Sequence, residues 1–378
     1  MRTRRGLCYP GPPQWEAQWR AVEEEEAGRG RKRRRRLHRV GGRMAEERAA
    51  AEWPDLFDTL PDDLVVSILS KLSASAAAPS DLASVRITCK RLNGLGLSPL
   101  VLAKASVKSL AVGARGWTES AHRFLKQCAD AGNLEACYML GMIRFYCLES
   151  RGSGAALMAR AAMGSHAAAL YSLAVIQFNG SGGSKRDKDL GAGVALCARA
   201  AVLGHVDALR ELGHCLQDGF GVRRNVAEGR RFLIQANARE LAAVLNASSP
   251  AAAAASSSAW QHHHRDGLAS GCSLLSDFGC NVPAPEAHPA NRFMAEWFAS
   301  RGGADESGPG EEGLRLCSHG GCGRAESRRH EFRRCSVCGV VNYCSRACQA
   351  LHWKLAHKAE CAPMERWLDA AGGVEMMN

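Results

Sequence analysis

The sequence predicts a mainly α-helical protein with a small metal-stabilised domain near its C-terminus. Alanine and glycine dominate a long segment that repeats internally, aromatic residues make up only 6% of the chain, and cysteines cluster toward the end. Small residues at helical spacing favour close helix packing over a β-sandwich. The predicted organisation is a disordered basic tail (1–52), short helices (53–98), helix-pair repeats (99–245), a low-complexity linker and connector (246–310), a cysteine-rich finger (311–366) and a tail (367–378).

The positive charge of the chain is concentrated in its first segment. The net charge is +11, and the run RGRKRRRRLHR at 29–39 holds eight of the lysines and arginines. Such charge blocks cannot bury a core, so we expect disorder. The run is either a nuclear import signal or a solvated tail that contacts acidic partners nonspecifically. Translation from Met44 would leave this tail out.

Residues 56–97 read as amphipathic helices. Pro61 suits the first turn of a helix, and Leu64, Ile68 and Leu72 recur at i, i+4 and i+8. The stretch PSDLASVRITCKRLNGL predicts one further helix. About forty residues in short helices cannot close a core alone, so part of this apolar surface is expected to meet a partner.

The pattern LPDDLVVSILSKL followed by DLASVRITCKRLNGL resembles an F-box. This resemblance implies docking on a Skp-type adaptor and, through it, on a cullin ubiquitin ligase. The residues that it assigns to that contact are Leu60, Pro61, Leu64, Ile68 and Leu69. The alternative is that the helices cap the N-terminal end of the repeats.

Residues 99–245 contain three segments that can be superimposed on one another. Each contains an alanine, a leucine four residues after that alanine, and a small residue directly after the leucine. The periods are 33 and 39 residues, as the alanines Ala136, Ala169 and Ala208 show. A period of this size with small residues at fixed positions predicts stacked helix pairs, although chance similarity within a helical bundle is the alternative. The segments resemble SEL-type repeats, relatives of the tetratricopeptide repeat, which implies an α-solenoid with a concave surface for protein ligands.

The linker and connector at 246–310 begins with the low-complexity sequence ASSPAAAAASSSA. It also contains an apolar helix candidate, NRFMAEWFA, ahead of a glycine-rich stretch.

Eight cysteines and histidines near the C-terminus have the spacing of zinc ligands. They are Cys317, Cys322, Cys335, Cys338, Cys344, Cys348, His357 and Cys361. Eight ligands suffice for two tetrahedral zinc ions, and thiolates suit zinc rather than hard cations. Too few apolar residues lie between them to form a core, so bound metal is expected to supply the folding energy. Spacing alone allows either sequential or interleaved sites.

The sequence YCSRACQALHWKLAHKAEC resembles a MYND zinc finger. The resemblance implies interleaved sites, with Cys317, Cys322, Cys344 and Cys348 on one ion and the other four ligands on the second. His319 is a possible substitute for Cys322, because the first pair is more widely spaced than usual. MYND fingers are protein-binding modules, and the surrounding arginines come without a base-stacking platform, which favours a protein partner over nucleic acid.

The order F-box, SEL-type repeats and MYND finger resembles a small group of plant F-box proteins. That resemblance implies a non-catalytic substrate receptor of a cullin–F-box ubiquitin ligase, located in the nucleus, the cytoplasm or both. The alternative is a nuclear zinc-finger scaffold in transcriptional regulation. No run of 18 apolar residues occurs, so we expect no membrane span.

Overall fold

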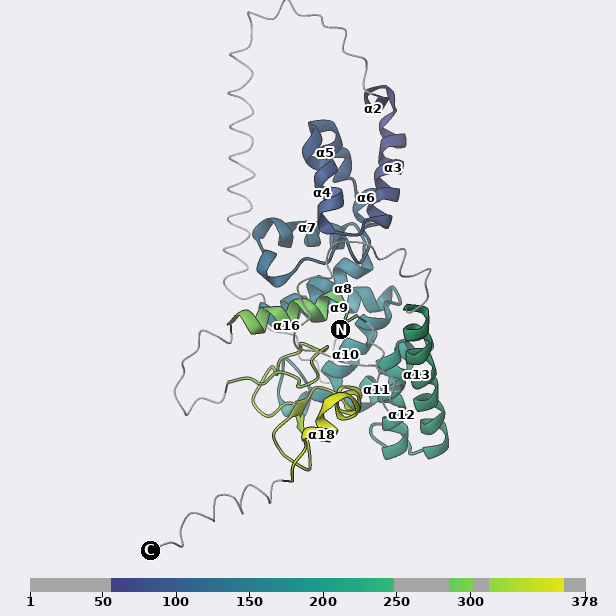
Figure 1. Cartoon of the computed structure of the whole chain (residues 1–378), viewed down its shortest axis with the longest axis vertical. Coiled ribbons are helices and arrows are strands. Elements are labelled where there is room, and N and C mark those ends of the chain that lie inside the picture. Colours follow the sequence, from purple (N-terminus) through teal and green to yellow (C-terminus); the bar gives the residue numbers. More distant parts are fainter. Residues whose placement is uncertain (1–55, 248–285, 302–312, 364–378) are drawn as a thin grey trace, which may run out of the picture. The chain divides into compact units, whose positions relative to one another are not determined.

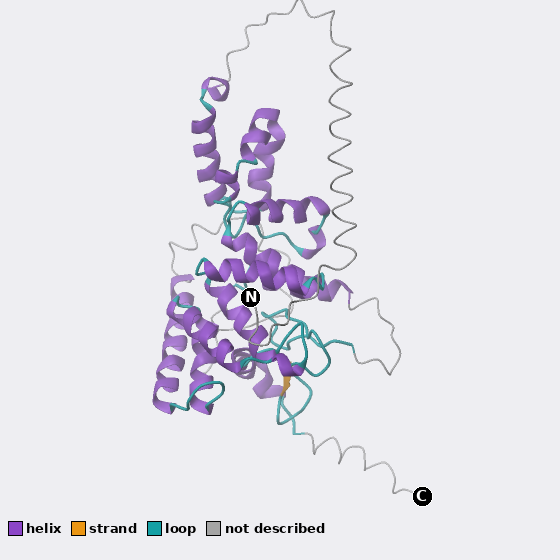
Figure 2. Cartoon of the chain, turned by 180° about the vertical axis from the view of Figure 1, so that it is seen from behind, coloured by secondary structure: helices purple, strands orange, loops and turns teal. Residues whose placement is uncertain are grey.

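The computed structural model describes residues 56–247, 286–301 and 313–363. The predicted disordered tail at 1–52, the C-terminal tail and much of the linker lie outside these residues. The chain divides into two compact units, Met1–Val65 and Val66–Asn378, which are described separately. Helices dominate the described part of the chain, and Figure 2 shows how little strand there is. The predicted mainly α-helical class is confirmed.

The described part of the first unit consists of α2 (Leu56–Thr59) and the first turn of α3 (Asp62–Ser75). Helix α3 begins directly after Pro61, and its first two residues are acidic, as suits the positive end of a helix dipole. The Leu64 N–H donates to the Pro61 carbonyl over 3.1 Å. The helix therefore begins where the sequence predicts.

The second unit continues with three short helices. They are α4 (Pro79–Thr88), α5 (Lys90–Gly96) and α6 (Pro99–Leu102). The single helix expected from PSDLASVRITCKRLNGL is wrong, because Cys89 is extended (φ −151°) and separates α4 from α5. The Cys89 sulfur accepts a hydrogen bond from the Leu92 N–H, so the side chain that breaks the helix also caps the next one.

The repeats form a row of helices that pack in sequence order, as Figure 1 shows. A 3-10 turn, η2 (Ala114–Gly116), precedes them. The helices are α7 (Glu119–Asp130), α8 (Leu134–Met142) with its π-helical extension η3 (Ile143–Cys147), α9 (Arg151–Met163), α10 (Ala167–Asn179), α11 (Leu190–Val202), α12 (Val206–Asp218) and α13 (Val226–Ala247). The 3-10 turn η4 (Lys185–Asp187) joins α10 to α11. The predicted stack of helix pairs is confirmed.

The second helix of each pair begins with the same kind of cap. The side chains of Asn133, His166 and His205 each accept a hydrogen bond from the backbone N–H three residues later, over 3.0 to 3.2 Å. These N–H groups belong to the three alanines whose spacing predicts the repeat, and all three alanines are buried. The repeat therefore reflects a recurrent cap and a recurrent buried position.

The small residues of the repeat allow close helix packing, as expected. A Cβ atom added to Gly141 of α8 would lie 3.0 Å from the carbonyl oxygen of Gly154 in α9. Two repeats later, in the equivalent pair, a Cβ on Gly213 of α12 would lie 3.0 Å from the carbonyl oxygen of Gly229 in α13. Neither position has room for a larger side chain without movement of the partner helix.

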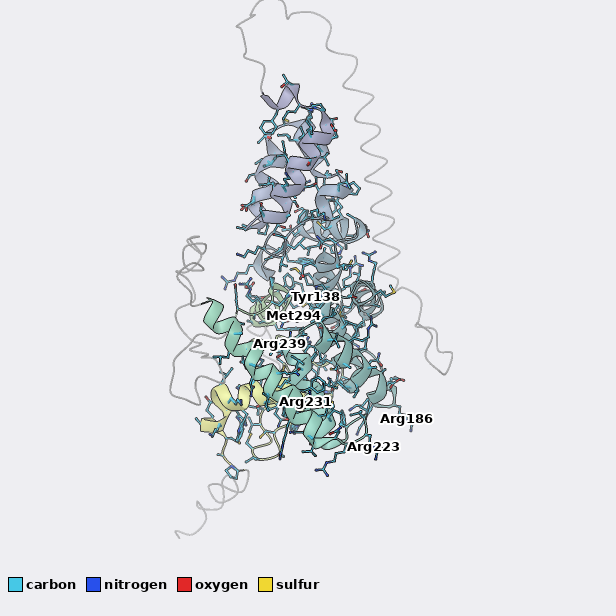
Figure 3. The ribbon with its side chains drawn as sticks, turned by 90° about the vertical axis from the view of Figure 1, so that its right-hand side faces the viewer. Tyr138, Arg186, Arg223, Arg231, Arg239 and Met294 are labelled. Atoms are coloured by element: carbon cyan, nitrogen blue, oxygen red, sulfur yellow. The ribbon has the colours of Figure 1, made fainter. Side chains whose placement is uncertain are left out.

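Helix α16 (Pro289–Arg301) lies within the stretch predicted as linker and connector, at the apolar helix candidate. It packs against α8, η2 and η3 through buried Phe293 and Met294. Phe293 meets the Trp117 ring edge-on with 5.1 Å between ring centroids. Figure 3 labels Met294 of α16 and Tyr138 of α8. Part of the expected connector is therefore a component of the repeat core.

The cysteine-rich finger contains the two-stranded sheet of the described residues. Its strands are β1 (Arg333–Arg334) and β2 (Asn342–Tyr343), antiparallel, with Arg333 opposite Tyr343. The helical elements α17 (Arg346–His352), η5 (Trp353–His357) and α18 (Lys358–Glu360) follow without a break. In none of the three described ranges is a helix both long enough and apolar enough to cross a membrane.

Candidate metal centre

The eight predicted ligands lie in two groups of four. Cys317, Cys322, Cys344 and Cys348 form one group, and Cys335, Cys338, His357 and Cys361 form the other. Within each group the candidate ligand atoms all lie within 4.8 Å of one another. The grouping is interleaved along the chain, as the resemblance implies, and not sequential. His319, the possible substitute for Cys322, belongs to neither group, and the same is true of His330 and His352.

The distances within each group fit a tetrahedral zinc ion. A Zn–S bond of about 2.3 Å puts neighbouring sulfurs about 3.8 Å apart. The Sγ–Sγ distances are 3.5 Å for Cys322 and Cys344, 3.6 Å for Cys344 and Cys348, and 3.9 Å for Cys335 and Cys361. None of the described cysteines forms a disulfide. The donor sets and their spacing indicate two zinc ions, one in an all-sulfur site and one with a histidine.

Local structure brings these ligands together in two ways. Cys335 and Cys338 lie on a tight turn in which the Gly339 N–H donates to the Cys335 carbonyl over 3.0 Å. Gly339 has φ +68°, which glycine adopts without strain. The second way is a helix cap, in which the Ser345 hydroxyl accepts from the Cys348 N–H over 3.1 Å at the start of α17. This cap fixes the helix start that carries Cys344 and Cys348 to one ion.

Both sites use full sets of four protein ligands. Four-coordinate zinc of this kind is structural, since no coordination position is left for water or substrate. Bound zinc would supply the folding energy of a segment that has few apolar residues of its own.

The finger is seated on the second helices of the repeats. Tyr171 of α10 donates its hydroxyl to Ser345 over 3.1 Å, and the Asn179 amide donates to the Cys344 carbonyl over 2.8 Å. On α12, the buried Glu211 carboxylate accepts from the Ala347 N–H over 2.8 Å. The finger thus packs on α10 and α12, and α16 packs on α8, so both occupy surface of the repeat helices.

Burial raises the pKa of the Glu211 carboxyl. The hydrogen bond from Ala347 and the charges of Arg346 and Arg333 oppose that effect. Glu211 thus meets the N-terminal turn of α17, where backbone N–H groups favour negative charge.

Arg324 is the buried link between the all-sulfur site and the repeats. It is 4% exposed, and its guanidinium lies 3.4 Å from the Cys322 sulfur and donates to Ser172 of α10 over 2.9 Å. The same group lies over the Tyr171 ring, 5.7 Å from its centroid. Four thiolates around one Zn²⁺ leave net negative charge, which a buried cation offsets.

The arginines around the finger do not form one solvated surface. Arg324 is buried, and Arg328 is half-buried and donates to the carbonyls of Asn179 and Gly180, at the end of α10. Arg329, Arg333 and Arg334 are exposed. The sequence alone does not distinguish these five positions.

The predicted adaptor-contact residues lie at the start of α3 and just before it. Leu64 and Ile68, one helical turn apart, are 48% and 44% exposed, so both side chains are accessible to a partner. Pro61 is exposed and Leu60 is half-buried. Leu69 is only 3% exposed, so its side chain contributes to packing in this structure. The role of these residues in binding an adaptor stays a prediction.

Three features of the site were not recognised in the sequence. They are the buried Arg324, the carboxylate of Glu211 on α12 and the docking of α16. Their contacts join residues between 136 positions apart, for Glu211 and Ala347, and 182 positions apart, for Ala114 and Glu296 of α16. A single sequence contains no signal that pairs such residues. The capping residues were detectable, because they recur with the same 33- and 39-residue periods as the alanines.

Family models match four parts of the chain. They are F-box-like at 57–104, plant tetratrico peptide repeats at 110–194, Sel1 repeat at 206–239 and MYND finger at 317–361. The order of the three kinds of module is the one predicted.

Two proteins of Arabidopsis thaliana are similar to almost the whole chain. F-box protein At1g67340 is 64% identical over 324 residues, which is 85% of this chain and 84% of that protein. F-box protein At5g50450 is 60% identical over 320 residues, covering 84% of this chain and 88% of that protein. A solved Sel1 repeat protein from Oxalobacter formigenes is 23% identical, with a TM-score of 0.28 over 35% of this chain and 92% of its own, too weak a likeness to support an argument.

Proposed function

The chain belongs to the plant F-box proteins that carry tetratricopeptide or Sel1 repeats and a MYND finger, and from that premise we propose that it is the substrate-recognition subunit of a cullin–F-box ubiquitin ligase. The F-box binds a Skp-type adaptor, and the repeats and finger hold a target protein. The observation that carries the proposal is the pair of exposed apolar side chains, Leu64 and Ile68, within the F-box match.

The mechanism that we propose is proximity. The chain itself has no catalytic role and holds the target near a ubiquitin-loaded subunit, which raises the effective concentration of the reacting groups. The proposed zinc ligands are the eight residues of the two groups, and their role is structural. We propose that the protein acts in the nucleus, the cytoplasm or both, away from membranes and without nucleic-acid binding.

The proposed domains follow the predicted boundaries, with one change. Residues 53–98 form the F-box, 99–245 the repeats and 311–366 the finger. Because α16 packs into the repeats, the stretch 289–301 is assigned to the repeat unit and not to the connector.

The test is the affinity of the full chain for a purified Skp-type adaptor, measured by calorimetry. Leu64→Ala with Ile68→Ala should weaken binding on the order of a hundredfold, since two apolar contacts at the centre of an interface are removed. The matched control is Met163→Ala with Val202→Ala, two side chains of the repeats that are 72% and 86% exposed.

The control variant should bind the adaptor like the wild type. If the wild-type chain fails to bind the adaptor, the ligase role is wrong, and a zinc-finger scaffold without ligase activity takes its place.

A further inference from the structure

Lysines are scarce in the part of the chain that is proposed to hold a target. Ten of the 49 lysines and arginines are lysines, and the others are arginines. Between Lys126 and Lys354 the sequence contains two lysines only, Lys185 and Lys188. Lysine is ordinarily among the commonest residues of a protein, so the repeats and most of the finger offer few primary amines.

Both of these lysines lie in the segment that joins α10 to α11, residues 180–189, which we call the lysine turn. Lys185 begins η4 and Lys188 follows η4 directly, and both residues are exposed. Figure 3 labels Arg186, which lies between them in the sequence, at the outer edge of the repeats. The two amines are therefore accessible to a large reactant.

Hydrogen bonds fix the shape of the lysine turn. Asp187 accepts from the Ser184 N–H over 2.7 Å. The Asp189 N–H donates to the Gln177 carbonyl over 3.1 Å, and its carboxylate accepts from the Ala192 N–H over 2.9 Å. Both acids of the turn are thus held in backbone hydrogen bonds, and in the part of the chain that the structure describes neither lysine forms an ion pair.

The stem of Lys188 lies against the end of α10. A Cβ atom added to Gly180, the left-handed residue that ends this helix, would lie 3.2 Å from the Lys188 Cγ atom. Partial burial lowers the pKa of the Lys188 amine. The positive charges of Arg328 and Lys185 lower this pKa further, and the carboxylate of Glu331 opposes them. More of this amine is therefore uncharged near pH 7 than in a fully solvated lysine.

The lysines nearest in sequence to this region are less suited to modification. Lys71, Lys90 and Lys104 belong to the F-box match, where the proposed adaptor binds. Lys126 and Lys354 are half-buried, and each has an interaction partner. The lysine turn is therefore the place in the repeats where exposed, unpaired amines occur together.

We propose that the lysine turn is the ubiquitin acceptor site of the repeats, with Lys188 as the main acceptor and Lys185 as the second. This inference rests on the proposed function, because a receptor held in a ligase brings its own amines near the ubiquitin thioester. It names the site at which the chain itself is modified.

The transfer step is an attack by the uncharged amine. The Lys188 Nζ attacks the carbonyl carbon of the thioester that joins the C-terminal carboxyl of ubiquitin to a cysteine of the ubiquitin-loaded subunit. A carbon–nitrogen bond forms, and the carbon–sulfur bond breaks as the cysteine thiolate leaves with the bonding electrons. One proton passes from the nitrogen to solvent, and the product is an amide between ubiquitin and Lys188.

The experiment maps the acceptor lysines of the full, zinc-loaded chain in a ligase reconstituted with the adaptor, cullin, RING subunit and conjugating enzyme. Ubiquitin whose own lysines are replaced by arginine limits each acceptor to one ubiquitin. Mass spectrometry of tryptic peptides then locates the diglycine remnant of ubiquitin after a short reaction. The remnant is expected chiefly on Lys188, with a smaller amount on Lys185.

Arginine substitutions measure how much of the transfer the lysine turn receives. Lys188→Arg with Lys185→Arg should lower the initial rate of chain modification at least about threefold, because an arginine side chain stays protonated and cannot attack. Lys188→Arg alone should lower the rate more than Lys185→Arg alone. The matched control is Lys108→Arg with Lys358→Arg, two exposed lysines outside the F-box match. This control should change the rate by less than about 1.5-fold, since neither residue is the proposed acceptor.

The reactivity of the amines is measured separately, without the ligase. Limiting acetylation of the full chain near pH 7, followed by mass spectrometry, should label Lys188 before Lys358, because more of the Lys188 amine is uncharged. Zinc content and thermal unfolding show that each variant is folded. Adaptor affinity is measured for every variant as well.

Three results would overturn the inference. They are diglycine remnants chiefly on lysines outside the lysine turn, an unchanged rate in the Lys188→Arg/Lys185→Arg variant, and faster acetylation of Lys358 than of Lys188. In a chain that binds the adaptor, each of these results leaves the ligase role standing. A chain that does not bind the adaptor contradicts the ligase role itself, and modification of this turn by the ligase with it.

Discussion

Glu135 of α8 shows how single residues connect the elements of this protein. Its two carboxylate oxygens lie 2.9 Å from His166 Nε2 and 2.7 Å from His288 Nε2. The Nδ1 atoms of these histidines accept from the N–H groups of Ala169 and Ala290, so each Nε2 carries a proton. The Nε2 of His166 donates to one oxygen of Glu135, and the Nε2 of His288 is paired with the other. One carboxylate thus fixes the caps of α10 and α16 at once.

Glu135→Gln should destabilise the protein at neutral pH. Burial raises the pKa of Glu135, but the side-chain hydrogen bonds from His166 and His288 outweigh it and lower the pKa to about 2. A carboxyl pKa lowered from 4.5 to about 2 corresponds to about 3 kcal/mol of stability. In the variant, the amide N–H₂ faces one imidazole N–H without an acceptor. Urea unfolding near pH 7 measures the loss.

The same substitution has a defined pH dependence. A lowered folded-state pKa stabilises the protein above pH 4.5, and this contribution is lost as the pH falls from 4.5 toward about 2. The stability difference between wild type and Glu135→Gln should stay constant from about pH 6 to 9 and shrink below about pH 4.5. A difference that grows on acidification would contradict the assignment.

Arg324→Met should weaken zinc binding at the all-sulfur site and destabilise the chain. Removal of a buried charge from its partners costs about 3–5 kcal/mol. Zinc release to a chromophoric chelator and urea unfolding report the two effects. Arg329→Met, an exposed change in the same segment, should alter stability by less than about 0.5 kcal/mol. Equal behaviour of the two variants would exclude a special role for Arg324.

At the scale of elements, the repeat packing predicts opposite effects for two glycines of α9. A Cβ on Gly154 would lie 2.6 Å from the Phe145 nitrogen and 2.7 Å from the Gly141 oxygen, both backbone atoms. Gly154→Ala should therefore cost about 1–3 kcal/mol. Gly152→Ala meets nothing within 4 Å and should stabilise the helix by up to about 1 kcal/mol. Thermal unfolding distinguishes them, and a stabilising Gly154→Ala would refute the close packing.

The elements were predictable wherever their signals are local. The repeat period identified α8, α10 and α12, because an alanine, a leucine and a small residue recur at fixed spacing. The helix break at Cys89 was not predictable, because helix propensity alone gives no reason for a helix to end there. The cap formed by the Cys89 sulfur becomes evident only from the extended backbone of this residue.

At the scale of the whole molecule, the finger and the repeats act as one body. The sequence predicts the ligands and their chemistry, because zinc sites have local spacing rules. It does not predict that Tyr171, Glu211 and Arg324 join the finger to α10 and α12, because those contacts bridge long intervals of chain. The order of the modules along the chain was predictable, but the docking of the finger on the repeats was not.

Zinc removal should therefore loosen the repeats as well as the finger. Chelation should increase amide hydrogen exchange in α10 and α12, which contact the finger. Helix α7, which packs against α6 and α8, serves as the internal control and should change much less. Unchanged exchange in α10 and α12 after zinc loss would mean that the repeats do not depend on the finger.

The central claim is that this chain couples a bound target to a ubiquitin ligase. The most direct test is ubiquitin transfer by a reconstituted ligase of adaptor, cullin, RING subunit and the full chain, with lysines of the chain itself as acceptors. We predict transfer that requires every component and is lost in the Leu64→Ala/Ile68→Ala variant but retained in the Met163→Ala/Val202→Ala control. Ubiquitin transfer that is equal in the wild type and the Leu64→Ala/Ile68→Ala variant would contradict the account. So would the absence of ubiquitin transfer when all the subunits are present.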